Sequence, residues 1–205
     1  ELVRPGDVVW DVGANIGLFA FSAAIRAGRN GRVIAFEPDT WLVQLLRRSA
    51  AIQPEASAPV SIVAAAVAGS LSLQTMMVAS RSRASNALAG YGHSQMGSIS
   101  ETQMVVALTL DWLSARLPPP NVIKCDVEGA ELEVLTGQPN ILDHIRPVII
   151  CEVSGQTSER MTNLLLAARY RLYNGEKTLS RGSEIERASW NTVAIPEERL
   201  QCYLT

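Results

Sequence analysis

The sequence predicts a single α/β domain, residues 1–205, built on a parallel sheet with helices on its faces. Short apolar runs, each closed by an acidic residue or a glycine, alternate with stretches of helical periodicity, which is typical of α/β proteins. The clearest runs are Val8–Val12, Arg32–Phe36, Val122–Cys125 and Pro147–Glu152. With 205 residues, 47% of them hydrophobic, the chain is long enough for one full core and short for two.

The charge pattern argues against a nucleic-acid partner. The formal net charge is -2, and the densest basic groups are the pairs Arg47 with Arg48 and Arg81 with Arg83, which we interpret as solvated surface. A nucleic-acid surface needs a larger basic cluster. No segment reaches the ~18 apolar residues of a membrane helix, and no signal-peptide pattern opens the chain, so no membrane partner is expected.

The three cysteines, Cys125, Cys151 and Cys202, have no C-x-x-C spacing and cannot all pair, so a disulfide scaffold is not expected. Cys125 and Cys151 lie in strand-like runs and are expected in the core. Unpaired cysteines fit a reducing, cytoplasmic setting. Because the chain opens almost on its first strand, the sequence leaves open whether a further segment precedes it.

The first strand leads into a glycine turn, G-A-N-I-G at residues 13–17, and then into a helix. Large residues recur there at helical spacing, at Leu18, Phe19, Phe21, Ser22 and Ile25. Glycines let a ligand approach the main chain, and a helix N-terminus offers free N–H groups. The dinucleotide fingerprint G-x-G-x-x-G is broken by Asn15, so the spacing favours S-adenosylmethionine over a dinucleotide.

Asp11 stands at the carboxyl end of the first strand, just before the turn. A carboxylate here would repel a pyrophosphate but attract the cationic methionine end of S-adenosylmethionine. The alternative is that Asp11 only stabilises the turn by accepting backbone N–H bonds. We favour the ligand contact, because open parallel sheets bind ligands at the carboxyl ends of their strands.

The second strand, Arg32–Phe36, ends in Glu37. A carboxylate about 20 residues after the glycine turn is where nucleoside-binding sheets hold the ribose hydroxyls, so Glu37 is the predicted ribose ligand. The alternative is a surface acid that caps the next helix. That helix is expected over Trp41–Ser49, with Asp39 or Thr40 as its N-cap.

A third apolar run, Val60–Val67, is bounded by Gly69. The small residues Ala65–Ala68 at its end would fall beside the second strand and leave room for an adenine ring. Packing beneath a helix would explain the same alanines, so both interpretations stay open.

The middle of the chain carries weaker signals. Leu71–Val78 alternates like a strand or hairpin arm, Met104–Leu108 resumes a strand-like run, and a short helix begins at Leu110. Between them, Ala79–Ser100 is rich in serine, glycine and asparagine, which predicts a mobile loop suited to substrate contacts. His93 in this loop could act as a general base, although a lone loop histidine is more often a bystander.

Lys124 lies in the apolar strand before Asp126, where a charge is costly unless it is paired. We expect Glu152, at the end of the next apolar strand, to be its partner. Asp126 and Glu152 would then stand at the carboxyl edge of adjacent strands and face the same crevice as Asp11 and Glu37. The alternative is an ion pair that only orders the sheet.

Glu128 and Glu131 precede or open the next helix, where the helix dipole alone could account for both acids. A catalytic role for them remains open beside that explanation. A further helix is expected over Ser158–Ala168, followed by two closing strands, Tyr170–Tyr173 and Thr192–Ile195.

Taken together, several motifs resemble the FkbM-type methyltransferases, from Val8 to Pro196. They are W-D-V-G-A-N-I-G at 10–17, A-F-E-P-D at 35–39, T-L-D-W-L at 109–113, I-K-C-D-V-E-G-A-E-L-E-V-L-T-G at 123–137 and an apolar strand ending in Glu152. The segment around Asp126 is the most specific of them. The glycine turn alone would indicate only the wider class of S-adenosylmethionine enzymes.

The resemblance implies a class I methyltransferase fold. This is a Rossmann-like three-layer sandwich, whose seven-stranded, mostly parallel sheet has an antiparallel last strand. It also implies S-adenosylmethionine as cofactor and methyl transfer to a hydroxyl oxygen of a polyketide, sugar or other small molecule.

The motif match also implies site residues. The methionine end would be held by Asp11, Gly13, Asn15 and Gly17, the ribose by Glu37, and the region near the sulfonium by Asp126. The other cofactor-binding candidates flank these motifs: Ala14, Phe36, Pro38, Ala65 and Ala66. The catalytic candidates are Asp126 as first choice for the base, then Glu128 and Glu152, together with Lys124. The acid that the family often has after the third strand is missing from Val67–Ser70.

Other functions remain open from the sequence. An NAD-linked oxidoreductase would share the strand, turn and helix, and the position of Glu37. A non-catalytic cofactor-binding module would share the whole fold, although the intact acids at the strand ends argue against a loss of catalytic activity. A divalent metal could bridge Asp126 and Glu152, but no decisive ligand set is present and none is predicted. The acceptor and the oligomeric state are not readable from the sequence.

Overall fold

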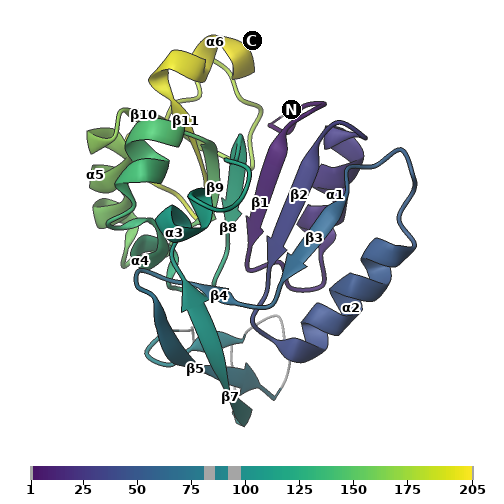
Figure 1. Ribbon diagram of the computed structural model, residues 1–205. Helices are drawn as coiled ribbons and strands as arrows, with labels where there is room; N and C mark the ends of the chain where they lie inside the picture. Colours follow the sequence, from purple (N-terminus) through teal and green to yellow (C-terminus); the bar gives the residue numbers. More distant parts are fainter. Residues whose placement is uncertain (1, 81–85, 92–97, 205) are drawn as a thin grey trace.

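The computed structural model describes residues 2–80, 86–91 and 98–204 (Figure 1). Within them, seven strands form a large sheet in the order β10-β11-β9-β8-β1-β2-β3, in which only β11 runs antiparallel to its neighbours. The strands are β1 Val8–Val12, β2 Arg32–Phe36, β3 Val60–Val63, β8 Val122–Cys125, β9 Val148–Glu152, β10 Tyr170–Asn174 and β11 Asn191–Pro196. The predicted seven-stranded, mostly parallel sheet with an antiparallel last strand is confirmed.

Helices cover both faces of this sheet (Figure 1). One face carries α1 Leu18–Ala27, α2 Thr40–Ala51 and α6 Leu200–Tyr203. The other carries α3 Leu110–Ser114, α4 Glu131–Leu135, the π-helical turn η3 Asn140–Ile145 and α5 Ser158–Ala167. A 3-10 turn, η4 Glu197–Arg199, precedes α6. Asp39 caps α2 as predicted, because its Oδ1 accepts a hydrogen bond from the Trp41 N–H at 2.8 Å.

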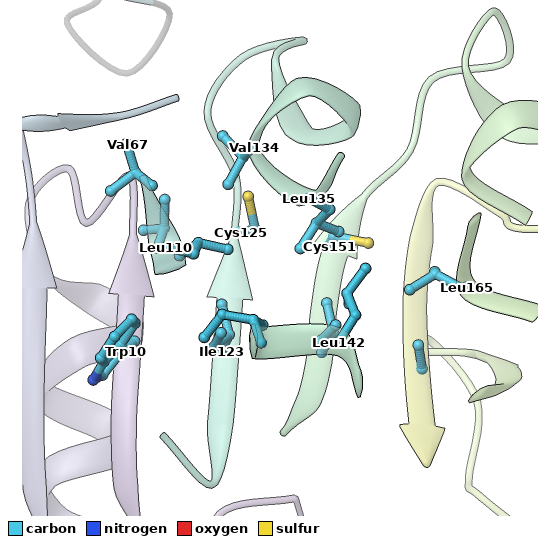
Figure 2. Close-up of a cluster of buried hydrophobic side chains, with 14 of the residues drawn as sticks. Trp10, Val67, Leu110, Ile123, Cys125, Val134, Leu135, Leu142, Cys151 and Leu165 are labelled. Carbon is cyan, nitrogen blue, oxygen red and sulfur yellow. The ribbon is translucent and has the colours of Figure 1, made fainter. Parts of the chain in front are cut away.

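Alternation along β1 divides its side chains between the two faces. Trp10 is fully buried and belongs to the same cluster as Ile123 and Cys125 of β8, to which α3, α4 and η3 also contribute side chains (Figure 2). Its ring meets that of Phe36 edge-on, with the centroids 5.6 Å apart. Val9 and Asp11 point to the other face, toward α1. The prediction that Cys125 and Cys151 lie in the core is confirmed, and both thiols are unpaired.

The buried face of α1 consists of small residues. The helix packs on the sheet through a row of small residues, Ala20, Ala23, Ala24 and Ala27, whereas Leu18 is 76% and Ile25 63% exposed. The predicted helix is confirmed. Alanines let the helix axis approach the sheet closely.

A second sheet lies beyond the carboxyl ends of β1 and β2, below their arrowheads in Figure 1. Its order is β4-β7-β5-β6, with β4 Ala66–Val67, β5 Ser72–Ala79, β6 Ala87–Leu88 and β7 Ile99–Leu108. The run Val60–Val67 was predicted as one strand, but it divides between the two sheets. The chain turns between them, where the Ala65 N–H donates to the Val63 carbonyl at 3.0 Å.

The predicted loop Ala79–Ser100 was also partly wrong, because β5 extends into it, β6 lies inside it and β7 begins within it. Residues His93, Arg81 and Arg83 lie outside the described residues. No helix among the described residues is long and apolar enough to cross a membrane.

Candidate functional site

A cavity opens where the carboxyl ends of β1, β2 and β8 face the second sheet. Its lining comes from the glycine turn, from the end of β2 and the residues after it, from the segment after β8, and from β4, β5 and β6 with the residues just before β4 and β6. The lining residues are Gly13, Asn15, Phe36, Glu37, Pro38, Ala65, Ala66, Val67, Met76, Asn86, Ala87, Leu88, Asp126, Val127 and Glu128. This is the edge at which a parallel sheet binds ligands.

The backbone N–H groups of the glycine turn donate hydrogen bonds within the protein. The N–H groups of Gly13 and Ala14 both donate to the Phe36 carbonyl at 3.0 Å, and that of Gly17 donates to the Ala14 carbonyl at 2.8 Å. The Asn15 N–H donates to the Glu37 carboxylate at 2.8 Å, from a backbone with φ of 52°. These donors are therefore not directed at a phosphate, as they would be in a dinucleotide turn.

Gly13 is required for packing as much as for ligand access. Its φ is 77°, and a Cβ at this position would collide with the Asp126 carbonyl oxygen. Gly17 has a φ of 90°, and a Cβ there would press on Phe21 and Leu46. The turn thus holds β1, α1 and the end of β8 together, and Gly13 also lines the cavity.

Glu37 is 5% exposed, and both of its carboxylate oxygens are held by backbone N–H groups. Oε2 accepts from Asn15 and Oε1 accepts from Asp39, each at 2.8 Å. Burial raises the pKa of Glu37 to about 7. The two hydrogen bonds lower the pKa, but the effect of burial is larger. A carboxylate oxygen can accept more than one hydrogen bond, so Glu37 can also receive hydroxyl donors from the cavity.

Asp11, Lys124 and Asp126 form one charged group behind and beside the cavity. Asp11 and Lys124 are register partners on β1 and β8, and the Lys124 Nζ lies 3.5 Å from the Asp11 Oδ1 and 3.0 Å from the Asp126 Oδ2. The Nζ also donates to the Gly13 carbonyl at 3.1 Å. The expected pairing of Lys124 with Glu152 is wrong: Lys124 lies opposite Ile150 on β9, two residues short of Glu152.

Burial and the contacts within this group explain the pKa shifts of Asp11 and Lys124. Burial raises the pKa of Asp11 to about 6, although the Lys124 ammonium opposes this shift. Burial lowers the pKa of Lys124, but the attraction of Asp11 and Asp126 outweighs it and the net shift is upward. Asp11 is completely buried, accepts no hydrogen bond within the described residues, and does not line the cavity. The predicted contact of Asp11 with the ligand stays a prediction, although its carboxylate lies outside the cavity lining.

Glu128 lines the cavity at the start of the segment before α4, with φ of 57°. Burial, followed by the repulsion of Asp126 and Glu152, raises its pKa to about 7. The loop is held by Glu131, whose Oε1 accepts from the N–H groups of Val127 at 2.8 Å and Gly129 at 3.1 Å. Glu131 therefore stabilises this loop through hydrogen bonds, in addition to the interaction with the helix dipole that the sequence suggested.

Glu152 ends β9 beside this group without lining the cavity. Burial and the neighbouring carboxylates of Asp126 and Glu131 raise its pKa. Asp126 and Glu152 stand at the carboxyl ends of adjacent strands as predicted, but only Asp126 lines the cavity.

The wall opposite the acids is apolar and comes largely from the second sheet. Ala65 and Ala66 line it as expected, together with Met76, Ala87 and Leu88. Asn86 is the polar member of this wall that sequence reasoning missed. Its Nδ2 donates to the Asp39 Oδ2 at 2.8 Å and its Oδ1 accepts from the Ala79 N–H at 2.9 Å.

The predicted site residues therefore fall into two groups. Those lining the cavity are Gly13, Asn15, Phe36, Glu37, Pro38, Ala65, Ala66, Asp126 and Glu128, and those outside its lining are Asp11, Ala14, Gly17, Lys124 and Glu152. The alternation in β5 did not identify Met76, because it favours the phase of Leu71 and Leu73, which the structure leaves exposed. No sequence signal identified Asn86.

The lining suits a nucleoside that carries a positive charge. Glu37 can accept hydroxyl donors, the apolar wall can cover a flat ring, and the Asp126 carboxylate favours a cation. The buried Asp11 carboxylate lies behind the same turn, where it is paired with Lys124. In the part of the chain that the structure describes, no three His, Cys, Asp or Glu side chains gather in a way that could hold a metal ion.

Comparisons with known proteins agree with this geometry. The methyltransferase FkbM domain matches residues 11–172. The hexuronic acid methyltransferase AglP of Haloferax volcanii is 31% identical over 169 residues, which are 82% of this chain and 65% of that protein. The chain therefore spans a little under two thirds of this relative.

Two solved structures share the fold. The methyltransferase FkbM from Methylobacillus flagellatus KT matches with a TM-score of 0.57 and 17% identity, over 94% of this chain and 48% of its own. The precorrin-6y C5,15-methyltransferase from Geobacter metallireducens GS-15 matches with a TM-score of 0.53 and 14% identity, over 95% and 82%. The sheet order and these neighbours confirm the class I methyltransferase fold.

Proposed function

Because this chain belongs to the FkbM methyltransferase family, we propose that it transfers a methyl group from S-adenosylmethionine to a hydroxyl oxygen of a small molecule, with a sugar as the favoured acceptor class. The single observation that carries the donor assignment is the cavity itself. It combines the Glu37 and Asp126 carboxylates with an apolar wall, and the glycine turn beside it keeps its N–H groups bonded internally.

Three parts of the cavity would hold the donor. Glu37 would accept the ribose hydroxyls, since both of its oxygens are oriented by backbone N–H groups and retain accepting capacity. Ala65 and Ala66 would lie against the adenine together with the β5 and β6 wall, where Asn86 supplies an amide. Asp126 and the turn at Gly13 would hold the methionine end.

This arrangement disfavours NAD. A pyrophosphate needs free backbone donors, and those of Gly13, Ala14 and Asn15 are already used. It would also face the Asp126 carboxylate, which repels a like charge. The Asp126 carboxylate attracts a sulfonium or an ammonium group, whereas Glu37 would suit the ribose of either cofactor.

S-adenosylmethionine, when bound, supplies a methyl carbon made electrophilic by the adjacent sulfonium. The protein would contribute mainly by positioning, bringing the acceptor oxygen to about 3 Å from its target in a site closed by the apolar wall. Lys124 would hold Asp126 in place through their 3.0 Å ion pair. The remaining requirement is a base that takes the hydroxyl proton.

Glu128 is the base that the geometry favours. It lines the cavity, and its pKa of about 7 matches the working range of a general base. Asp126, the first choice from sequence, has one oxygen committed to Lys124, and Glu152 stands outside the lining. We therefore place Glu128 first and leave Asp126 as an orienting group.

Calorimetric titration with S-adenosylmethionine and with NAD tests the donor, and methyl transfer from a radiolabelled donor to hydroxylated sugars tests the reaction. We expect binding of S-adenosylmethionine alone, and transfer that survives a strong chelator. Glu37→Gln should weaken donor binding at least tenfold, while Glu55→Gln on the exposed surface should not. NAD binding without S-adenosylmethionine binding would overturn the proposal, and tight donor binding without transfer to any acceptor would indicate a non-catalytic module.

A further inference from the structure

A second cavity, of about 290 Å³, lies between the second sheet and α4. Leu88 lines both this cavity and the donor cavity, so the two adjoin across a single side chain. Ala130 of the new cavity comes two residues after Glu128 of the other one. A molecule held here would thus lie next to the segment that carries the proposed base.

The polar lining of this cavity consists of uncharged hydrogen-bonding groups and one carboxylate. They are Ser70, Gln74, Tyr91, Thr136 and Glu133. Hydroxyls, an amide, a phenol and a carboxylate together offer both donors and acceptors, which is the complement that a polyhydroxylated ring needs. The volume lies just below the usual range for small-molecule sites, which suits a ligand as small as one sugar ring.

Several of these groups keep capacity for a ligand. The Gln74 Nε2 donates to the Ser72 Oγ at 2.9 Å, which leaves its second N–H and its carbonyl oxygen. The Thr136 Oγ1 donates its proton to the Leu132 carbonyl at 2.6 Å, so it can only accept from a ligand. Burial and the Glu133 carboxylate, to which the Tyr91 hydroxyl is hydrogen-bonded, raise the pKa of Tyr91. The Tyr91 oxygen can therefore accept a hydrogen bond from a ligand, and the second Glu133 oxygen can do the same.

The field across both cavities is negative. Glu133 lines the second cavity, Glu128 and Asp126 line the first, and Glu152 stands beside them. Lys124 is the cation of this group, and it is already paired with Asp11 and Asp126. An acceptor with a carboxylate of its own would add one more like charge to this set.

We propose that the cavity between the second sheet and α4 is the acceptor subsite, and that it takes an uncharged polyol such as a neutral sugar ring. A uronic acid, the class named for the relative AglP, is disfavoured here. This inference rests on the proposed methyltransferase function and adds the location and charge class of its acceptor.

Matched pairs of acceptors test the charge class. Each pair is a methyl glycoside of glucose, galactose or mannose and the corresponding uronic acid, which differ only at C6. Rates are measured at pH 8 with radiolabelled donor, and binding to the donor-loaded protein is followed by saturation-transfer NMR. We expect kcat/KM, or the NMR-derived affinity, to be at least tenfold higher for the neutral member. Equal or better use of the uronic acid, or no binding of either member, overturns the inference.

Two variants test the location. Gln74→Leu should raise the acceptor KM about tenfold. Glu133→Gln changes an exposed side chain and keeps the fold, and it should lower the kcat/KM ratio of neutral to acidic acceptors severalfold. The matched controls are Gln103→Leu on β7 and Glu159→Gln on α5, which lie outside both cavities. Calorimetry with S-adenosylmethionine separates the two proposals. If both variants bind S-adenosylmethionine normally and keep the wild-type acceptor KM and acceptor preference, only the subsite is contradicted. If the wild-type protein does not bind S-adenosylmethionine, the proposed function itself is contradicted.

Discussion

Lys124 shows how single residues shape this site. It carries a charge on a strand buried on both faces, and that charge is tolerated because Asp11 and Asp126 lie 3.5 and 3.0 Å away. Glu37 is buried as well, and two backbone N–H groups hold it. The polar residues of the site are thus anchored before any ligand arrives, which lowers the cost of positioning one.

Replacing the lysine tests this charged group. Lys124→Met leaves the fully buried Asp11 without its cation, so we expect a loss of about 3 kcal/mol in the free energy of unfolding. Urea denaturation measures it. The double variant Lys124→Met with Asp11→Leu should recover part of the loss, because it removes the stranded carboxyl. An unchanged urea midpoint for Lys124→Met would show that the pair contributes nothing.

The proposed base has a pH signature. Glu128 must be ionised to accept a proton, and burial and neighbouring carboxylates raise its pKa to about 7, so kcat should rise as the pH increases through about 7 and level off above it. Glu128→Gln should lower kcat about 100-fold or more and abolish this inflection. Glu159→Gln serves as control. If the inflection persists in Glu128→Gln, the base is another group.

Buried Glu37 also affects stability. Its pKa is about 7 in the folded protein against an ordinary value of 4.5, so the folded state binds the proton more tightly and loses stability as the pH rises through about 7. Relative to Glu37→Gln, which cannot ionise, the wild-type protein should therefore be more stable at pH 5 than at pH 8. Thermal melts of both proteins at the two pH values measure the difference, and a constant difference would contradict the shift.

At the level of elements, the site depends on two connections. The glycine turn joins β1 to the end of β8 through the tight packing of Gly13 on Asp126. Asn86 joins the second sheet to the start of α2, through Asp39 on one side and the Ala79 N–H on the other. The first connection shapes the acidic side of the cavity, and the second places the apolar wall over it.

Removing the second connection should affect binding more than stability. Asn86→Ala deletes both hydrogen bonds and releases β6 from α2, so we expect the dissociation constant of S-adenosylmethionine to rise about tenfold. Asn163→Ala, on the exposed side of α5, is the control. Titration calorimetry gives the constants, and equal values for the two variants would mean that the wall does not depend on Asn86.

For the whole molecule, the cavity lies between two sheets, so a bound donor would connect them. At a concentration of about 100 times its dissociation constant, a ligand that binds only the folded state adds about 2.7 kcal/mol of stability. For a chain of this length this corresponds to a rise in Tm of roughly 5 to 10 °C. Scanning calorimetry with S-adenosylmethionine should show this rise and with NAD should not. The reverse result would point to the dinucleotide.

The sequence by itself determined the α/β class, most strand and helix positions, the turn at 13–17 and the acids at the strand ends. These features depend on local periodicity and on motif spacing, which a single sequence carries. Only the tertiary structure decided that Lys124 pairs with Asp11, that alanines form the buried face of α1, and that Asn86 and Met76 close the cavity. These outcomes depend on which strands become neighbours and how closely a helix approaches the sheet, and both follow from long-range packing that local patterns do not encode.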